Sequence, residues 1–316
     1  MCDRKVFVIP YFGKVPNHIQ LWFDSCASNT NFTWLFISDQ SLEGLKIPSN
    51  IIARRSQLSE LCKIFTDGVG NKVCLENPYK LCDFKPLFWM LLDYYKIEYA
   101  FWGYCDIDVL FGRLNIFLSE DQFLKYDRIG SFGHLTLIRS TDKYKNAYKL
   151  DGAKIPWQKV LFEKEIFGFD EHYGLNRIWE KQKFRYYDTK NDCLDVLPDY
   201  KKFFLANIPQ NKKGQLFVYY KGKILQLYSG KNQDIVQTEF AYVHFQKRAM
   251  KINFNHFSQQ IIQINHNGFS ALKNMPKEDR DFAITNIQER ENLNVKLSKV
   301  KTILRYYKNL YLSKVV

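Results

Sequence analysis

The segment FWGYCDIDVLFG, residues 101–112, places two acids inside an otherwise apolar stretch of the chain. Positions i and i+2 of a strand share one face, so Asp106 and Asp108 are expected to point the same way at the strand's exposed end. Two neighbouring carboxylates among apolar residues are unfavourable unless a cation neutralises them. Mg²⁺ and Mn²⁺ take such oxygen ligands and keep positions free for the phosphates of a substrate. A solvent-exposed Asp-x-Asp turn is the alternative, and the apolar flanks favour the metal site.

The chain has 316 residues and a globular composition, with 46% hydrophobic and 16% aromatic residues. The apolar run before Pro10 is too short for a signal peptide, and no stretch reaches the length of a membrane-spanning helix. The seven cysteines include no CxxC pair, and several lie in apolar segments, as reduced thiols do. These features predict a cytoplasmic protein, either free or docked on the inner face of the cell membrane.

The formal net charge of +13 indicates an anionic partner, such as nucleic acid, an anionic membrane surface or a phosphorylated substrate. The sequence has no zinc-finger spacing, no RNP-type aromatic motif and no Arg-rich arm. We therefore expect phosphorylated substrates or a membrane surface, and no nucleic acid.

Apolar segments with strand and helix patterns alternate along the first third of the chain. Strands are expected at residues 5–10, 33–37, 50–54 and 99–105, and helices at residues 18–27, 58–65 and 83–95. Asp83 followed by Pro86 is typical of an N-cap and a first helical turn. The alternation, with acids after a strand, predicts an α/β sheet whose binding crevice lies outside the carboxyl ends of its strands.

The later sequence has weaker patterns. A strand is expected at residues 135–139, a helix led by residues 169–171, a hairpin at 215–228 and a last strand at 239–246. We divide the chain into a catalytic domain, residues 1–284, and a basic tail, residues 285–316.

The tail is predicted to be an amphipathic helix, because its basic and apolar residues recur at helical spacing and residues 292–316 include no acid. It either docks on an anionic membrane surface or packs on the catalytic domain with its basic face in solvent.

Two blocks, PYKLCDFKP at residues 78–86 and WGYCDID at residues 102–108, resemble a group of bacterial capsular and cell-surface polysaccharide biosynthesis proteins of the GT-A glycosyltransferase class. The resemblance covers roughly residues 4–250. It implies a single-sheet, GT-A-like nucleotide-sugar-binding domain that requires Mn²⁺ or Mg²⁺. It also implies transfer of a hexosyl-type sugar from a nucleoside diphosphate donor, by analogy a UDP-sugar, to a glycan or lipid-linked oligosaccharide.

The resemblance also implies which residues contact the donor. In GT-A enzymes the end of the first strand and its turn bind the nucleotide, which here means Pro10, Tyr11 and Phe12. Tyr11 either stacks on a base or is a surface aromatic. Asp39, after the second strand, either accepts hydrogen bonds from the base or ribose or is an ordinary turn residue.

Further donor contacts are expected near the two motif blocks. Lys80 and Lys85 flank a predicted helix N-terminus, where backbone amides and the helix dipole favour phosphate. Asp83 is either the helix cap or a donor contact. Asp106 and Ile107, in the acidic motif, complete this part of the predicted donor site.

The block YVHFQKR at residues 242–248 supplies the third predicted metal ligand. Many GT-A enzymes add a His from a C-terminal strand and then a basic residue on the diphosphate, which implies His244 followed by one of Lys247, Arg248 and Lys251. The spacing from the His to the basic residue is shorter than usual. A lone His in an apolar strand can also be a core residue.

Asp170 and Glu171 precede a predicted helix, where inverting GT-A enzymes place a carboxylate that deprotonates the acceptor hydroxyl. Asp170 suits an N-cap, which leaves Glu171 as the base. The alternative is that both acids only satisfy the helix N-terminus. His134, before a strand, is expected to line the acceptor pocket.

Two other classes compete with an inverting glycosyltransferase. A nucleotidyltransferase would need a Gly-rich phosphate loop after the first strand, and residues 10–16 are a poor one. A non-catalytic carbohydrate-binding or scaffold protein would not need both acids of the Asp-x-Asp motif together with His244.

Overall fold

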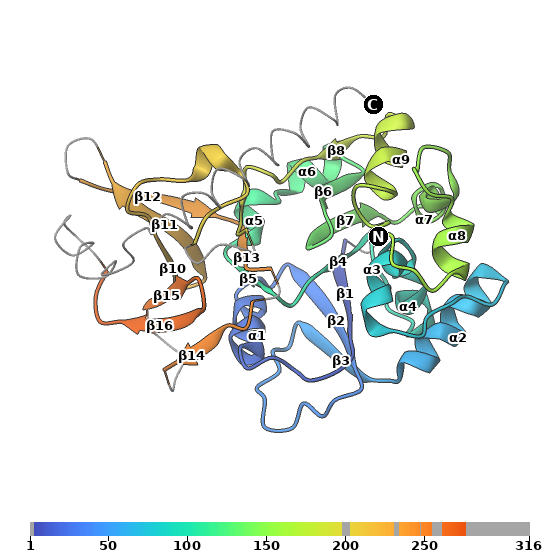
Figure 1. Cartoon of the computed structure of the whole chain (residues 1–316), viewed down its shortest axis with the longest axis horizontal. Helices are drawn as coiled ribbons and strands as arrows, with labels where there is room; N and C mark the ends of the chain where they lie inside the picture. Colours follow the sequence, from blue (N-terminus) through green and yellow to red (C-terminus); the bar gives the residue numbers. More distant parts are fainter. Residues whose placement is uncertain (1–2, 198–202, 231–233, 247, 255–260, 276–316) are drawn as a thin grey trace.

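The computed structural model describes residues 3–197, 203–230, 234–246, 248–254 and 261–275 of the chain (Figure 1). These residues form a mixed α/β structure with three sheets. The prediction of an α/β fold is therefore confirmed, whereas the prediction of a single sheet is wrong. The predicted amphipathic helix at residues 285–316 lies outside the described residues and stays a prediction.

The largest sheet has seven strands in the order β3-β2-β1-β4-β7-β6-β8. The first four strands of this order run parallel, and β7 pairs antiparallel with β4. Its members are β1 (Lys5–Tyr11), β2 (Phe32–Ser38), β3 (Ile51–Arg55), β4 (Phe101–Cys105), β6 (Arg128–Phe132), β7 (Leu135–Arg139) and β8 (Tyr186–Tyr187). The carboxyl ends of β1, β2 and β4 therefore meet at one edge, as the alternating pattern predicts.

Helices cover both faces of this sheet, which explains why residues 6–10 of β1 and the whole of β4 are apolar. Phe7 packs with α1 on one face, and its neighbours Val6 and Val8 pack with α2 and α4 on the other. The helices are α1 (Ile19–Ala27), α2 (Leu58–Val69), η1 (Pro78–Lys80), α3 (Leu81–Phe84), η2 (Lys85–Leu87), α4 (Trp89–Tyr94), α5 (Leu114–Phe117), α6 (Glu120–Lys125), α7 (Asp142–Lys145), η3 (Ala147–Lys149), α8 (Trp157–Phe162), α9 (Leu175–Lys181) and η4 (Ile208–Gln210).

A six-stranded sheet lies on the other side of the molecule, with strand order β12-β11-β10-β15-β16-β14 (Figure 1). It consists of β10 (Leu216–Tyr220), β11 (Lys223–Ser229), β12 (Ile235–Phe240), β14 (Lys251–Asn253), β15 (Ile261–Asn265) and β16 (Gly268–Leu272). The predicted hairpin is confirmed as β10 and β11. The predicted last strand is wrong in extent, because it divides between two sheets and further strands follow it.

The smallest sheet connects the other two and positions the site. Its order is β5-β13-β9, from β5 (Val109–Phe111), β9 (Cys193–Asp195) and β13 (Tyr242–His244). The Asp-x-Asp motif connects β4 of the large sheet directly to β5 of the small sheet. It brings together three segments that are far apart in the sequence.

Two predicted helix starts are wrong. Residues 78–94 form four short helical segments instead of one long helix, and Asp83 lies inside α3 and not at its N-cap. Proline cannot donate a helical hydrogen bond, and Pro86 falls in the break between α3 and α4. α9 begins at Leu175, so Asp170 is a turn residue and not an N-cap. Among the described residues, no helix has the length and apolar character needed to cross a membrane.

Candidate active site

The two acids of the motif lie in the short connection between β4 and β5, directly after the strand predicted to precede them. Ile107 between them is buried in the core, and its carbonyl oxygen accepts a hydrogen bond from His18 Nε2 at 3.1 Å. This anchor leaves Asp106 and Asp108 on the opposite side of the connection. The side chain of Ile107 therefore supports the acids and does not offer a surface to a donor.

β13 brings His244 to these acids. It pairs with β5 so that His244 lies opposite Val109, and its Nε2 is 3.5 Å from Asp108 Oδ1. One ligand atom from each of Asp106, Asp108 and His244 lies within 4.8 Å of the others. The three metal ligands predicted from the sequence are thus gathered at one point.

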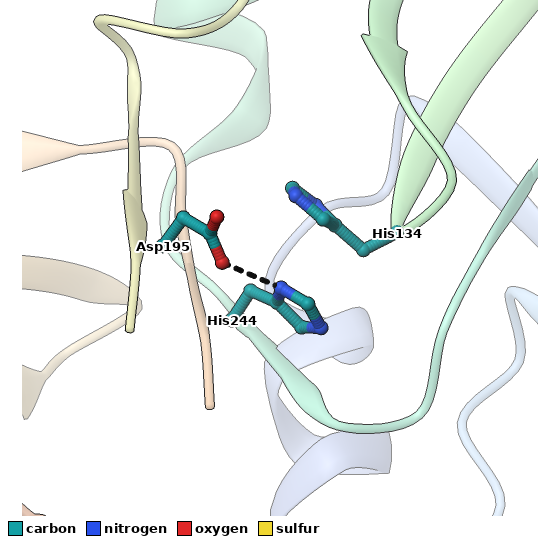
Figure 2. A group of neighbouring side chains, drawn as sticks. All are labelled: His134, Asp195 and His244. Atoms are coloured by element: carbon teal, nitrogen blue, oxygen red, sulfur yellow. Dashed lines mark hydrogen bonds and ion pairs between the residues drawn. The ribbon is translucent and has the colours of Figure 1, made fainter. Parts of the chain in front are cut away.

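The other edge of the His244 ring contacts a residue that sequence reasoning missed. Nδ1 is 2.8 Å from Asp195 Oδ1 (Figure 2). β9 runs parallel to β13, and the register places Asp195 directly beside His244. No local pattern could have revealed Asp195, because it ends a three-residue strand whose partner is distant in the sequence.

The carboxylates dominate the electrostatics of this centre. Burial acts to lower the pKa of His244, but Asp108 and Asp195 raise it to about 10. Burial raises the pKa of Asp106, Lys85 acts against that, and Asp108 raises it further. Two carboxylate oxygens and an imidazole nitrogen form a donor set that fits Mn²⁺, and a dication would offset the concentrated negative charge.

His134 covers one face of the His244 ring. The two rings are stacked with centroids 4.1 Å apart and planes inclined by 29°. Figure 2 shows the two side chains next to each other. His134 is buried, and burial followed by the nearby His244 lowers its pKa well below the ordinary value. Neither of its ring nitrogens has a hydrogen-bond partner among the described residues. The predicted acceptor residue therefore lies against a predicted metal ligand.

Lys85 connects Asp106 of the predicted metal site to Asp170 of the acidic pair. Its Nζ lies 2.9 Å from Asp106 Oδ1, 3.0 Å from Asp170 Oδ2 and 3.0 Å from the carbonyl oxygen of Gly133. Burial acts to lower the pKa of Lys85, but the two carboxylates raise it well above its ordinary value. An ammonium has three protons, and these acceptors use all of them. Lys85 is therefore in the predicted site as a link between carboxylates, with no proton left for a phosphate in this arrangement.

The acidic pair, Asp170 and Glu171, lies against Gly133 in the turn between β6 and β7. Glu171 Oε1 accepts a hydrogen bond from the N–H of Gly133, and its side chain is 28% exposed. Asp170 is more buried, and burial raises its pKa to about 6 although Lys85 acts against the rise. A Cβ on Gly133 would lie 2.4 Å from Asp170 Oδ2 and 2.8 Å from Glu171 Oε1. Only glycine allows this approach, which is a second feature that the sequence did not reveal.

Tyr11, the last residue of β1, lies close to Asp108. Asp108 adds to the effect of burial in raising the pKa of Tyr11, whose hydroxyl donates to the carbonyl of Lys14. Pro10 and Phe12 are partly buried, and Phe12 packs on the core beneath the sheet.

Asp39 joins the ends of β1 and β2. Its Oδ1 accepts a hydrogen bond from the N–H of Gly13 at 3.1 Å, which ties the loop after β1 to the loop after β2. Hydrogen bonds from the neighbouring Gln40 side chain and then from the Gly13 amide lower the pKa of Asp39. Asp39 therefore shapes the loops where a nucleoside is predicted to bind.

Of three other predicted donor contacts, Lys80 and Asp83 have partners inside the protein, and the third is not among the described residues. Lys80 and Asp83 form a buried ion pair at 2.9 Å, and the Asp83 carboxylate also accepts the N–H groups of Phe167 and Phe169. These two residues brace the fold, and their burial excludes the predicted contact with a donor in this arrangement. Lys247 lies outside the described residues.

Arg248 donates hydrogen bonds to the carbonyl oxygens of His266 and Leu197. Its guanidinium therefore ties the small sheet region to the six-stranded sheet. This position leaves its predicted contact with a diphosphate without support from the described geometry.

The profile of a family of unknown function, DUF6625, matches residues 7–273. The chain belongs to this family. No curated protein and no solved structure matches the chain. The region shared with DUF6625 includes the Asp-x-Asp motif, Lys85, the acidic pair, Asp195 and His244, so the whole site lies inside it.

Proposed function

We propose that this member of DUF6625 is a metal-dependent glycosyltransferase with a GT-A-like site. It transfers a sugar from a nucleoside diphosphate donor, a UDP-sugar, to a glycan or lipid-linked oligosaccharide. The observation that supports this most is the convergence of Asp106, Asp108 and His244 beside the carboxyl ends of parallel strands. The carboxyl edge is where α/β sheets bind nucleotides.

Asp106, Asp108 and His244 would hold Mn²⁺ or Mg²⁺. When bound, the dication supplies Lewis-acid stabilisation of the negative charge on the departing nucleoside diphosphate. The loops after β1 and β2, fixed together through Asp39, would bind the nucleoside next to this centre.

Glu171 is the proposed base. Its side chain is more exposed than that of Asp170, so it can reach an acceptor hydroxyl. Glu171 removes the hydroxyl proton while the acceptor oxygen attacks the anomeric carbon, and the bond to the diphosphate breaks with inversion. Asp170 and Lys85 hold the turn that carries this base.

The test is the thermal stability of the protein with UDP, in Mn²⁺ and in EDTA. We expect UDP to raise the melting temperature in Mn²⁺ and much less in EDTA, because the acids repel a diphosphate without a cation between them. Asp108→Asn should remove this difference, lower transfer on the order of 10³-fold and keep the fold. Asp67→Asn, at an exposed position of α2, is the control.

Equal stabilisation by UDP in both buffers would contradict the metal-dependent donor site. Unfolding of Asp108→Asn would show that this carboxylate is structural. Metal-dependent UDP binding without release of sugar from any UDP-sugar would favour a carbohydrate-binding or scaffold protein instead.

A further inference from the structure

We propose that Asp195 is a positioning residue that makes His244 a metal ligand and thereby makes the site prefer Mn²⁺ to Mg²⁺. The inference rests on the proposed metal site and goes beyond its ligands. His244 presents opposite ring edges to two carboxylates, Nδ1 to Asp195 at 2.8 Å and Nε2 to Asp108 at 3.5 Å. Figure 2 shows Asp195 on the Nδ1 side of the ring.

The contact on Nδ1 determines which nitrogen can bind a metal. A neutral imidazole that donates a hydrogen bond from Nδ1 has its lone pair on Nε2. When a metal displaces the Nε2 proton, that lone pair would face Asp108, on the side of the Asp-x-Asp motif. A carboxylate on the outer nitrogen also makes the imidazole a stronger donor to a metal.

One ligand atom from each of His134, Asp195 and His244 also lies within 4.8 Å of the others, but we assign Asp195 to support the ligand and not to join it. An ion held by Asp106 and Asp108 would meet the Nε2 edge of the ring, and the Nδ1 edge is already hydrogen-bonded to Asp195. Oδ1 of Asp195 also accepts a hydrogen bond from Gln246 Nε2 at 3.0 Å. These contacts hold the carboxylate on the outer side of His244.

The small sheet holds this arrangement rigidly. The N–H of Val196 donates to the carbonyl of His244 at 2.9 Å, and the N–H of Phe245 donates to the carbonyl of Asp108 at 2.9 Å. Gln246 adopts φ of 45°, in the left-handed region that L-residues rarely occupy, and its amide contacts Asp195 in this conformation. The three side chains therefore come from neighbouring backbone segments in the order Asp108, His244, Asp195.

The position of His134 supports the same conclusion. Its ring is stacked on the face of His244 and occupies neither of the two ring edges that meet Asp108 and Asp195. His134 closes that face against solvent and leaves orientation of the ring to Asp195. An imidazole ligand suits Mn²⁺ better than Mg²⁺, so the preference between the ions depends on how firmly His244 is held.

The test measures metal binding to the full chain by calorimetry, with Mn²⁺ and Mg²⁺ separately and without donor. Asp195→Ala should weaken Mn²⁺ binding by about 10–100-fold and change Mg²⁺ binding little, so the preference for Mn²⁺ falls. Asp195→Asn can still accept the Nδ1 hydrogen bond through its amide oxygen, and we expect Mn²⁺ affinity within a few-fold of the wild type. Asp192→Asn, whose partner is the Tyr187 hydroxyl, is the control.

A second readout reports the ligand directly. Pulsed electron paramagnetic resonance should detect an imidazole nitrogen bound to Mn²⁺ in the wild type and in Asp195→Asn, and lose it in Asp195→Ala. Because Asp195→Asn keeps the shape of the side chain, it remains informative if Asp195→Ala does not fold. In that case, loss of the nitrogen signal in a folded Asp195→Asn protein would overturn the role assigned to the hydrogen bond.

Other outcomes separate the inference from the proposed function. Unchanged Mn²⁺ binding in Asp195→Ala, or equal weakening for both ions, overturns the role of Asp195 alone. A wild type that binds Mn²⁺ with nitrogen ligation but does not bind UDP contradicts the glycosyltransferase and leaves Asp195 supported. A wild type that binds no Mn²⁺ overturns the metal site and this inference together.

Discussion

Lys80 and Lys85 are both buried, both pair with aspartate and are five positions apart, yet they belong to regions with different tasks. Lys80 pairs with Asp83, whose carboxylate also accepts the N–H groups of Phe167 and Phe169. That region fixes the chain leading to the acidic pair. Lys85 instead joins Asp106 to Asp170, so its partners belong to the site itself.

The difference between these regions shows what distinguishes a structural ion pair, such as Lys80–Asp83, from a candidate functional site. Burial and ion pairing are common to both, so neither identifies a functional residue. The Asp83 carboxylate has its oxygens occupied by internal donors, whereas the side chain of Asp106 is 36% exposed and faces Asp108 and His244. Carboxylates that still have access to solvent and to one another can bind a cation.

The largest expected effect comes from removing each lysine in turn. Lys80→Met should lower the free energy of unfolding by about 3–5 kcal/mol, because it leaves a buried charge without its partner. The Mn²⁺ affinity of the folded protein should not change. Lys85→Met should also destabilise the metal-free protein, but it should strengthen Mn²⁺ binding a few-fold, because Lys85 competes with a cation for Asp106.

Denaturant unfolding in EDTA followed by Mn²⁺ titration measures both quantities for both variants. A change in Mn²⁺ affinity in Lys80→Met would show that Lys80 also affects the metal site, which would contradict its assignment to the fold alone. Weaker binding in Lys85→Met would show that this lysine mainly orients Asp106.

The next effect concerns Glu171, the proposed base, which follows the segment that Asp83 holds. Glu171→Gln should lower turnover by roughly 10²–10³-fold, because a proton acceptor is lost, while donor affinity stays within a few-fold. Steady-state kinetics and UDP titration in Mn²⁺ test this. Glu163→Gln, at an acid that pairs with Lys159 on α8, is the control. Parallel loss of donor binding would place Glu171 in the donor site.

A smaller effect is expected where the two regions meet. Gly133→Ala would place a Cβ 2.4 Å from Asp170 Oδ2 and force the acidic pair to move without removing a charge. Turnover should fall by about 10–100-fold through misplacement of the base, while Mn²⁺ affinity is retained. Ser131→Ala, in β6 just before this turn, is the control. Wild-type turnover in Gly133→Ala would mean that the position of the pair is unimportant.

The smallest effect is the pH dependence of metal binding. With the pKa of His244 raised to about 10, the metal-free protein carries a proton there between pH 6.5 and 8.5. Metal binding must displace that proton, so Mn²⁺ affinity should rise with pH, by at most about tenfold per unit. Calorimetry in buffers of different ionisation enthalpy counts the released proton. Affinity independent of pH would exclude His244 as a ligand in this range.

The local patterns of the chain predicted more of the large sheet than of the site. The strands β1, β2, β3 and β7 and the helices α1 and α2 follow from runs of apolar residues with a clear period. The types of the proposed metal ligands could also be chosen from the sequence, because paired acids and a His in apolar segments are unusual. The helix predicted from Asp83 failed because its carboxylate has distant backbone partners.

The sequence by itself determined the α/β alternation and the chemistry of the proposed ligands, since both depend on residues close together in the chain. Only the tertiary structure decided that Asp195 contacts His244, that Lys85 joins Asp106 to Asp170, and that Gly133 lies against Asp170 and Glu171. These contacts depend on the pairing of β5 with β13 and of β13 with β9, and on turns between distant strands. Strand register is set by packing over the whole molecule, and no short stretch of sequence encodes it.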